Sequence, residues 1–528
     1  MKKLLIATTL FCLSGGLFAQ TLISEKQIPL TKEQRKNEPI YAMHNEVSNG
    51  VMVLFESSKA KREKGEKRKY QRYELSADQN LNVTDGNYVT LGTKNSVKPK
   101  FFFKDFRIGY TTWIDDDEKT DMMIVQIIKF DKSNKVIDVK DFEVCTEREF
   151  SDYQIVSNNG DLILLVQYES KAKETKNLDF VKYYRIDGNT LEIKSESDLN
   201  LLGRDQFGIE SMLAVNNSIY LVGKQLQQIK PFKFKLTKDF ILFKLDENGK
   251  EQGRTTLGLP NGFKMAGVQL TTHKNDLYLI GEYAPSTAQP VMKSYPANNK
   301  SVKVSNSYIG MFVSNYSLND LTKGVTKVYD YEKDIMRKLR KGNPGFNKKG
   351  GSFVLSDFMF LADGSFYVTA EMYVKFWRTT VTKEATQTVY RYYTDFDFKD
   401  AVVYKFTKDC ELDWLYQIDR DSYTANYTGH LKSEKPPTGG KLDVFLLDNN
   451  TLSVMYNTPG GKYGKRRFGL SGLNISPDGT SKDAVDFTSD SQFGQLYGGV
   501  VQVDKNTIIA VGTDKKEDNL WLKKIKLN

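Results

Sequence analysis

The residue types that most often carry catalysis are scarce in this chain. It has three histidines, His44, His273 and His430, and none has a second histidine three or four residues away, which is the spacing of two metal ligands on one helix. The serine-nucleophile motif G-x-S-x-G and the glycine-rich phosphate motifs are also absent. We therefore predict no catalytic residue, no metal site and no cofactor.

Two groups of carboxylates could still do chemistry. In "YRYYTDFDFKD", Asp395 and Asp397 alternate along an extended strand, which places them on one face, as a carboxylate pair for glycoside cleavage would require. The run from Asp115 to Glu118 could hold a hard cation such as calcium, but it lacks the glycine and the spacing of a known loop. A polar strand face and a solvated turn are the simpler interpretations, and we prefer them.

Basic and aromatic residues give a stronger pattern. Lysine and arginine gather in long segments between apolar strands, such as "KAKREKGEKRK" from Lys59, and aromatic residues join them in "VKFWRTTVTKEATQTVYRYY" from Val374. Clustered positive charge attracts anionic macromolecules, and aromatic rings offer flat surface for sugars or side chains. The candidate binding residues are Lys233, Lys235, Arg337, Arg340, Trp377, Arg378, Arg391, Tyr392, Lys465, Arg466 and Arg467.

The elements that position these residues are repeated. Short apolar strands that follow a turn with Asn, Asp or Gly begin near Ser48, Arg107, Asn158, Asn216, Lys274, Ala362, Asp448 and Asp504. A second series of hairpins interleaves with them and begins at Lys69, Asp121, Phe180, Phe240, Ser307, Ala401, Arg467 and Leu520. The unit is therefore four strands, A to D, which recurs about every 50–60 residues, as in propeller blades.

The two ends of the chain complement each other. The last unit stops at its strand C, "LWLKKIKLN", whereas "QTLISEKQIPL" from Gln20 has the pattern of a strand D. We therefore predict an all-β fold, a β-propeller of four-stranded blades whose ring is closed by the N-terminal strand. The count favours eight blades, and seven is the alternative because the unit from Lys100 to Val144 is irregular. Tandem β-sandwiches are the rival fold.

This pattern resembles the secreted bacterial β-propellers with degenerate repeats. The resemblance covers residues 20–528, which it implies form one domain. It is architectural, because the WD dipeptide, the kelch double glycine and a strict Asp-box are all absent. It therefore implies a fold and no particular activity.

The predicted topology places most of the positively charged connections on one face of the propeller. In a propeller the B–C and D–A connections emerge on one face, and the A–B and C–D turns emerge on the other. The long B–C connections of this chain are mostly basic, and the second unit, with its Asp run, is the exception. We therefore expect one basic face.

The first residues have the pattern of an export signal. Lys2 and Lys3 precede a short apolar run, and Ala19 ends a small-residue cleavage site, so we expect residues 1–19 to be a signal peptide. A lipoprotein signal that uses Cys12 is the less favoured alternative. No later segment is apolar over 18 residues, so we predict no transmembrane segment. The expected location is periplasmic, outer-membrane-associated or extracellular.

These observations lead to a functional expectation. With a formal net charge of +10, the chain is expected to be a non-catalytic exported protein that binds a macromolecule through its basic B–C/D–A face. The expected partners are an anionic polysaccharide, lipid headgroups or a partner protein, and nucleic acid is unlikely outside the cytoplasm. The alternatives are a glycan hydrolase or lyase with its site at the mouth of the axial channel, and a structural envelope protein.

Overall fold

A computed structural model gives the conformation of most of the chain. The residues that it describes are 20–36, 39–55, 58–59, 70–91, 97, 99–115, 122–146, 149–169, 179–202, 206–230, 233–285, 301–304, 309–342, 352–383, 388–419, 423–428, 442–460, 467–481, 484–487, 494–514 and 518–527. The expected signal peptide, His430, Lys465 and Arg466 lie outside these ranges.

The described residues form a nearly all-β structure of eight antiparallel sheets, numbered here in chain order. Sheet 1 contains β2 (Pro39–Asn45), β3 (Gly50–Phe55), β4 (Ser58–Lys59), β5 (Tyr70–Ala77) and β6 (Val83–Leu91). Sheet 2 contains β7 (Phe101–Phe102), β8 (Arg107–Asp115), β9 (Met122–Phe130) and β10 (Val136–Thr146). Sheet 3 contains β11 (Phe150–Asn158), β12 (Asp161–Glu169), β13 (Asp179–Asp187) and β14 (Ile193–Leu199). Sheet 4 contains β15 (Gln206–Val215), β16 (Ser218–Lys230), β17 (Lys233–Asp246) and β18 (Glu251–Leu257).

The second half of the chain continues the pattern. Sheet 5 contains β19 (Lys264–His273), β20 (Asp276–Ala284), β22 (Gly310–Ser317) and β23 (Lys323–Asp330). Sheet 6 contains β24 (Ser352–Phe360), β25 (Phe366–Lys383), β26 (Thr388–Phe406) and β27 (Leu412–Ile418), with β21 (Ser301–Val304) and β28 (Tyr423–Thr428) added. Sheet 7 contains β29 (Leu442–Leu446), β30 (Leu452–Gly460), β31 (Arg467–Ile475) and β32 (Val485–Asp486). Sheet 8 contains β33 (Gly494–Asp504), β34 (Thr507–Thr513), β35 (Asn519–Leu527) and β1 (Gln20–Pro29).

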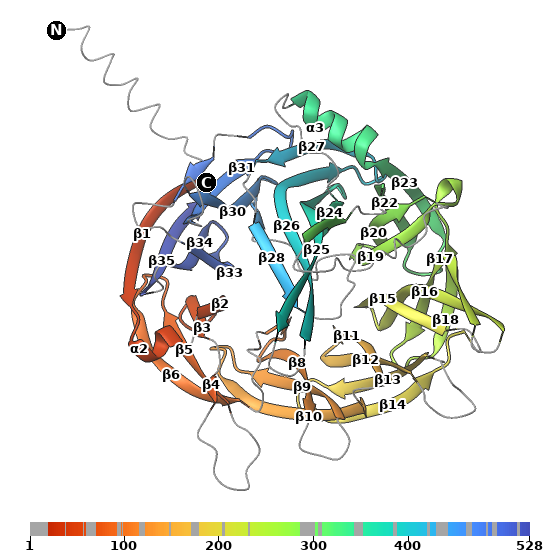
Figure 1. Cartoon of the computed structure of the whole chain (residues 1–528), viewed down its shortest axis with the longest axis horizontal. Helices are drawn as coiled ribbons and strands as arrows, with labels where there is room; N and C mark the ends of the chain where they lie inside the picture. The colour runs from red at the N-terminus through yellow and green to blue at the C-terminus, as the bar shows by residue number, and fades with distance from the viewer. Residues whose placement is uncertain are drawn as a thin grey trace.

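The sheets follow one another around a common centre in chain order, which is a propeller-like arrangement (Figure 1). Helix is scarce among the described residues. It consists of α2 (Lys32–Lys36), a 3₁₀ turn (Pro260–Gly262), and a π-helical segment (Tyr331–Met336) that continues into α3 (Arg337–Gly342). No helix among the described residues has the length and apolarity needed to cross a lipid bilayer.

The predicted pairing of the N-terminal strand with the last strand is confirmed. β1 runs antiparallel to β35, with Gln20 opposite Leu527 and Ile28 opposite Leu520. The buried side chain of Gln20 also reaches sheet 7, where its Nε2 donates to Ser453 Oγ at 2.7 Å. β1 therefore completes sheet 8 and also contacts sheet 7 through Gln20.

The turns between the third and fourth strands share one construction. In sheets 1 to 4 an aspartate carboxylate accepts a hydrogen bond from the backbone N–H two residues later. A residue three or four positions after that aspartate has a positive φ: Leu81 (64°), Asn134 (63°), Leu191 (57°) and Gly249 (81°). The two leucines are unexpected there, because β-carbon contacts disfavour this conformation.

Apolar clusters lie between neighbouring sheets and form the core. Between sheets 8 and 1, Val51 and Val53 pack with Ile509 and Val511. The cluster between sheets 1 and 2 is much smaller and consists of Val97, Ile128 and Phe130, with Val136 against them. Buried polar side chains take the place of apolar ones there: Arg72, Glu74 and Arg107 are 0%, 5% and 2% exposed. This interface is therefore unusually polar.

Candidate binding surface

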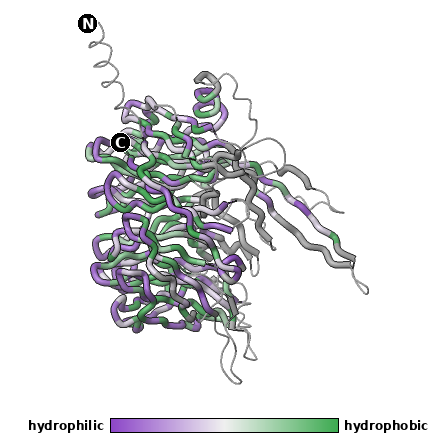
Figure 2. Tube along the Cα trace, turned by 90° about the vertical axis from the view of Figure 1, so that its left-hand side faces the viewer, coloured by the Kyte–Doolittle hydropathy of each residue, from purple (hydrophilic) through white to green (hydrophobic). Residues whose placement is uncertain are grey.

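The most distinctive element is an extension of sheet 6. β25 and β26 are 18 and 19 residues long, and only their inner halves pair with β24 and β27. Beyond Tyr373 the hairpin continues and gains β21 on one side, with Val302 opposite Trp377, and β28 on the other, with Ala425 opposite Phe396. We call this four-stranded part the projecting sheet. It crosses the centre of the ring in Figure 1, and the view in Figure 2 shows long strands leaving one side of the disc.

The sequence explains why this hairpin is extended. "YVKFWRTTVT" is rich in β-branched and aromatic residues, which favour strands. The burial alternates with period two, because Lys375, Trp377 and Thr379 are buried whereas Phe376 and Arg378 between them are half-buried. One face of the projecting sheet is therefore covered at its base, and the other is accessible.

An ion pair lies on the accessible face. Arg378 Nε contacts Asp395 Oδ2 at 2.9 Å across the hairpin, and the side chains are 32% and 12% exposed. The pair neutralises both charges at the base of the projecting sheet. Towards the tip, the register places Arg391 opposite Thr380 and Tyr392 opposite Thr379. The register therefore places Arg391 further along the hairpin than the ion pair.

The structure brings four of the candidate binding residues together: Trp377, Arg378, Arg391 and Tyr392 all belong to this hairpin. The others lie on separate elements. Lys233 and Lys235 are at the far end of the β16–β17 hairpin, opposite Lys230 and Gln227; Arg337, which is exposed, and Arg340 are on α3; and Arg467 begins β31 opposite Gly460.

Trp377 requires a correction. The sequence suggested that its ring offers an exposed flat surface, but its side chain is 5% exposed. The ammonium group of Lys375 lies 5.9 Å from the centroid of the ring. The residue alternation explains the difference, since Trp377 is on the covered face and Arg378 is on the accessible one. Trp377 therefore packs against the covered face of the hairpin, and its ring offers no surface on which a ligand could stack.

The groups considered for chemistry lie in structural settings. His44 Nε2 is 3.2 Å from Asn49 Oδ1, and the ring of His273 stacks on Phe360. Asp395 is paired with Arg378, and the side chain of Asp397 lies outside the described residues. Across the described part of the chain, no group of His, Cys, Asp and Glu side chains could hold a metal ion.

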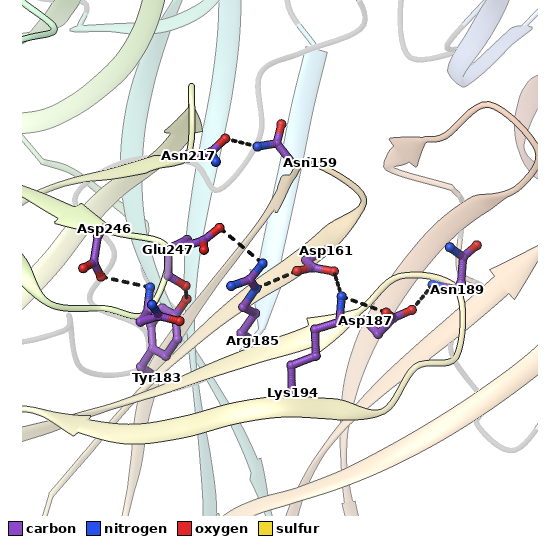
Figure 3. Close-up of polar contacts among 11 residues, drawn as sticks. Asn159, Asp161, Tyr183, Arg185, Asp187, Asn189, Lys194, Asn217, Asp246 and Glu247 are labelled. Carbon is purple, nitrogen blue, oxygen red and sulfur yellow. Dashed lines mark hydrogen bonds and ion pairs between the residues drawn. The ribbon is translucent and has the colours of Figure 1, made fainter.

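A charged cluster that the sequence did not reveal joins sheets 3 and 4 (Figure 3). Asp161 receives Arg185 Nε and Lys194 Nζ, both at 2.6 Å, and Lys194 also contacts Asp187 at 2.8 Å. Arg185 reaches Glu247 of sheet 4 at 3.3 Å. Every charge in the cluster has a partner of opposite sign, so it fastens one sheet to the next and leaves no group available for a ligand.

Comparisons with known proteins give little beyond this geometry. No protein-family model and no curated protein matches the chain. Among solved structures, it is similar to the alpha-L-arabinofuranosidase Arb93A of Fusarium graminearum, with 10% identity and a TM-score of 0.29 over 72% of this chain and 94% of that one. It is also similar to a Synechocystis apocarotenoid oxygenase, with 9% identity and a TM-score of 0.29 over 56% of this chain. The match spans 64% of the length of that oxygenase. Likeness at this level carries no argument about activity.

Proposed function

We propose that the chain is a closed, eight-bladed β-propeller, that it is exported, and that it binds an anionic polysaccharide without catalysis. The eight sheets in chain order, the β1–β35 pairing and the apolar cluster between sheets 8 and 1 support the ring. The pattern of residues 1–19 supports export to the periplasm, the outer membrane or the extracellular space.

The projecting sheet is the observation that carries the binding proposal. A B–C hairpin that continues well beyond its blade and recruits β21 and β28 contributes little to closing a ring, so its surface is available for another role. In a propeller it leaves the same face as the basic B–C connections. An elongated polyanion would lie along this face, held by arginine and lysine and by Tyr393, which is opposite Arg378.

Polysaccharide is preferred over lipid headgroups or a partner protein because Tyr393 is opposite Arg378 and two residues from Arg391, so the register places an aromatic residue and two arginines on one strand face. Sugar rings stack on tyrosine while carboxylate or sulfate groups contact arginine. Asp395 is engaged by Arg378, and no observation favours the alternative of a glycan hydrolase or lyase.

Retention on heparin tests this proposal. Wild-type protein should be retained at about 0.15 M salt, where exposed charges more than a Debye length apart are screened. Reversing Arg378, Arg391, Arg466 and Arg467 to Glu should move elution to lower salt. Replacing residues 380–391 by Asn-Gly, which closes the hairpin early, should do the same.

The matched control reverses four exposed lysines of the opposite turn face, Lys132, Lys250, Lys408 and Lys505, to Glu. It changes the net charge by the same amount, so nonspecific ion exchange would shift both variants equally. An equal shift, or unchanged retention of the arginine variant, would contradict the proposal. Tighter binding to anionic vesicles than to heparin would point instead to a lipid surface.

A further inference from the structure

A second candidate site lies between sheets 1 and 2. It is at the face of the disc that carries the A–B and C–D turns, and the projecting sheet extends from the other face. The site is a pocket of about 710 Å³ at the unusually polar interface, where the β2–β3 turn of sheet 1 meets the β9–β10 turn of sheet 2. Its volume is in the range of small-molecule sites. The lining residues are Asn45, Ser48, Met52, Glu74, Ser76, Thr84, Tyr88, Val89, Ser133, Lys135 and Val136.

A buried ion pair fixes one wall of this pocket. Arg72 Nε donates to Glu74 Oε1 at 3.1 Å, and Arg72 Nη1 donates to the carbonyl of Val97 at 3.1 Å. Burial raises the pKa of Glu74 above its ordinary value, and Arg72 opposes that rise. Such a pair holds a carboxylate in one orientation, although it does little for stability compared with apolar packing. A rigid carboxylate on the wall of a pocket suits recognition.

Polar groups on the pocket walls lack protein partners. Glu74 uses only Oε1, so Oε2 accepts no hydrogen bond from any residue that the structure describes. The buried Ser48 Oγ also has no partner there. Asn45 uses its Oδ1 for the backbone N–H groups of Val47 and Ser48, which leaves its Nδ2 to donate elsewhere. Ser48 Oγ is closed off from solvent, whereas Glu74 Oε2 and Asn45 Nδ2 are not among the buried atoms that lack a partner and remain open to a ligand or to water.

The charges around the pocket balance. The groups that act electrostatically on Glu74 are Arg72, Asp131 and Lys135, so two acids face two bases. The neighbouring pair of Arg107 with Glu46 is neutral as well, at 2.6 Å. A balanced site of fixed charges offers hydrogen bonds without favouring a charged ligand. This distinguishes the pocket from the basic face.

The remaining wall is apolar and partly open. Met52, Val89 and Val136 line it, and Tyr88 is 47% exposed at the edge of the sheet. The ring of Tyr88 packs on that of Tyr73, with centroids 5.2 Å apart, on the other face of sheet 1, because these two residues are opposite each other and alternate with Glu74 and Val89. Carboxylate and amide groups beside an apolar wall match a sugar, which has an apolar face and a rim of hydroxyls.

We propose that this pocket binds an uncharged sugar, either free or as a unit of a glycan. Glu74 Oε2 accepts a hydrogen bond from one of its hydroxyls, Asn45 Nδ2 donates to another, and Val89 packs against its apolar face. The site is independent of the polyanion surface, since the two share no residue.

Calorimetric titration with defined sugars tests the pocket. The probes are glucose, galactose, mannose, N-acetylglucosamine, cellobiose and lactose, with glucuronic acid and glucosamine as charged counterparts. At least one neutral sugar should bind. Val89→Ala should weaken that binding about fivefold, which corresponds to the apolar contact that is lost. Glu74→Gln, which retains an oxygen for Arg72, should weaken it as well.

The control is Phe102→Ala, which removes an apolar side chain, 66% exposed, that does not line the pocket. It should bind sugar like the wild type. The proposal is overturned if no neutral sugar binds at about 50 mM, which is weaker than typical recognition. It is also overturned if only a charged sugar binds, or if both pocket variants bind normally. None of these results bears on heparin retention.

Discussion

Asp187 shows how a single side chain organises its own turn. It ends β13 and accepts hydrogen bonds from Lys194 and from the backbone N–H groups of Asn189 and Thr190. The bond from Lys194, followed by that from Thr190, lowers the pKa of Asp187 from 3.8 to about 2. The carboxylate is therefore held in its charged form by the turn that it organises.

This shift predicts a pH dependence of stability. A carboxyl group whose folded pKa lies below its unfolded value contributes stability above the unfolded pKa, and loses it as the pH falls through the folded one. Asp187 should therefore stabilise the fold above about pH 4 and lose that contribution between about pH 4 and pH 2. Asp187→Asn should be less stable than the wild type at pH 7, and the difference should shrink towards pH 2.

Urea unfolding at pH 7, 4, 3 and 2 measures this difference. The control is Asp105→Asn, because Asp105 is 77% exposed and has only a 3.9 Å contact with Lys132. Its difference from the wild type should stay small throughout. A constant difference for Asp187→Asn across the pH range would refute the assignment.

The turns between third and fourth strands show two opposing effects within one element. Leu191 has a φ of 57°, a conformation that costs a leucine about 1 kcal/mol relative to glycine. The same side chain is 0% exposed and belongs to the cluster between sheets 2 and 3. Truncating a buried leucine typically costs about 2–5 kcal/mol, so packing outweighs backbone strain.

Leu191→Gly should therefore lower the free energy of unfolding by about 2 kcal/mol, even though it relieves the backbone. Asn216→Gly is the control, because Asn216 has a φ of 50° in an exposed turn and gives up no buried apolar surface. It should be neutral or slightly stabilising. Denaturant titration decides between the effects, and a stabilised Leu191→Gly would show that the turn, not the packing, dominates.

The strands and turns could be predicted from the sequence because their signals are local. Alternating apolar residues and Asn- or Gly-containing turns marked the second and third strands of all eight sheets. Only the long hairpin of the projecting sheet could be predicted. β21 and β28 could not, because they are four and six residues long and join from distant segments. The pocket could not be predicted from the sequence. Arg72 and Glu74 alternate with Tyr73 and Leu75, and this pattern is typical of an ordinary polar strand face.

At the scale of the whole molecule, the two ends of the chain meet in one sheet. Such an arrangement hides the edge of β35, which would otherwise present unpaired backbone groups. It also brings sheet 8 against sheet 1 through Val501, Val503, Ile509 and Val511. Assigning the basic connections to one face and the sugar pocket to the other depends on the proposed closure of the ring, because the propeller topology sets which connections share a face.

A disulfide across β1 and β35 tests the closure most directly. Thr21 and Lys526 are opposite each other and exposed, so Thr21→Cys with Lys526→Cys should form a disulfide on mild oxidation. With the protein produced without residues 1–19, which contain Cys12, the two remaining thiols should not compete, because burial raises the pKa of Cys145 to about 11 and that of Cys410 to about 12. The mismatched control is Lys26→Cys with Lys526→Cys, since Lys26 lies opposite Leu522.

The decisive measurement is the thermal unfolding midpoint of the oxidised Thr21–Lys526 variant. If the ends fasten the ring, the link should form in the matched pair only and should raise the midpoint, because cross-linking a loop of this length removes about 4 kcal/mol or more of chain entropy from the unfolded state. Equal cross-linking of the mismatched pair, or failure of the matched pair to cross-link in folded protein, would contradict the closed ring.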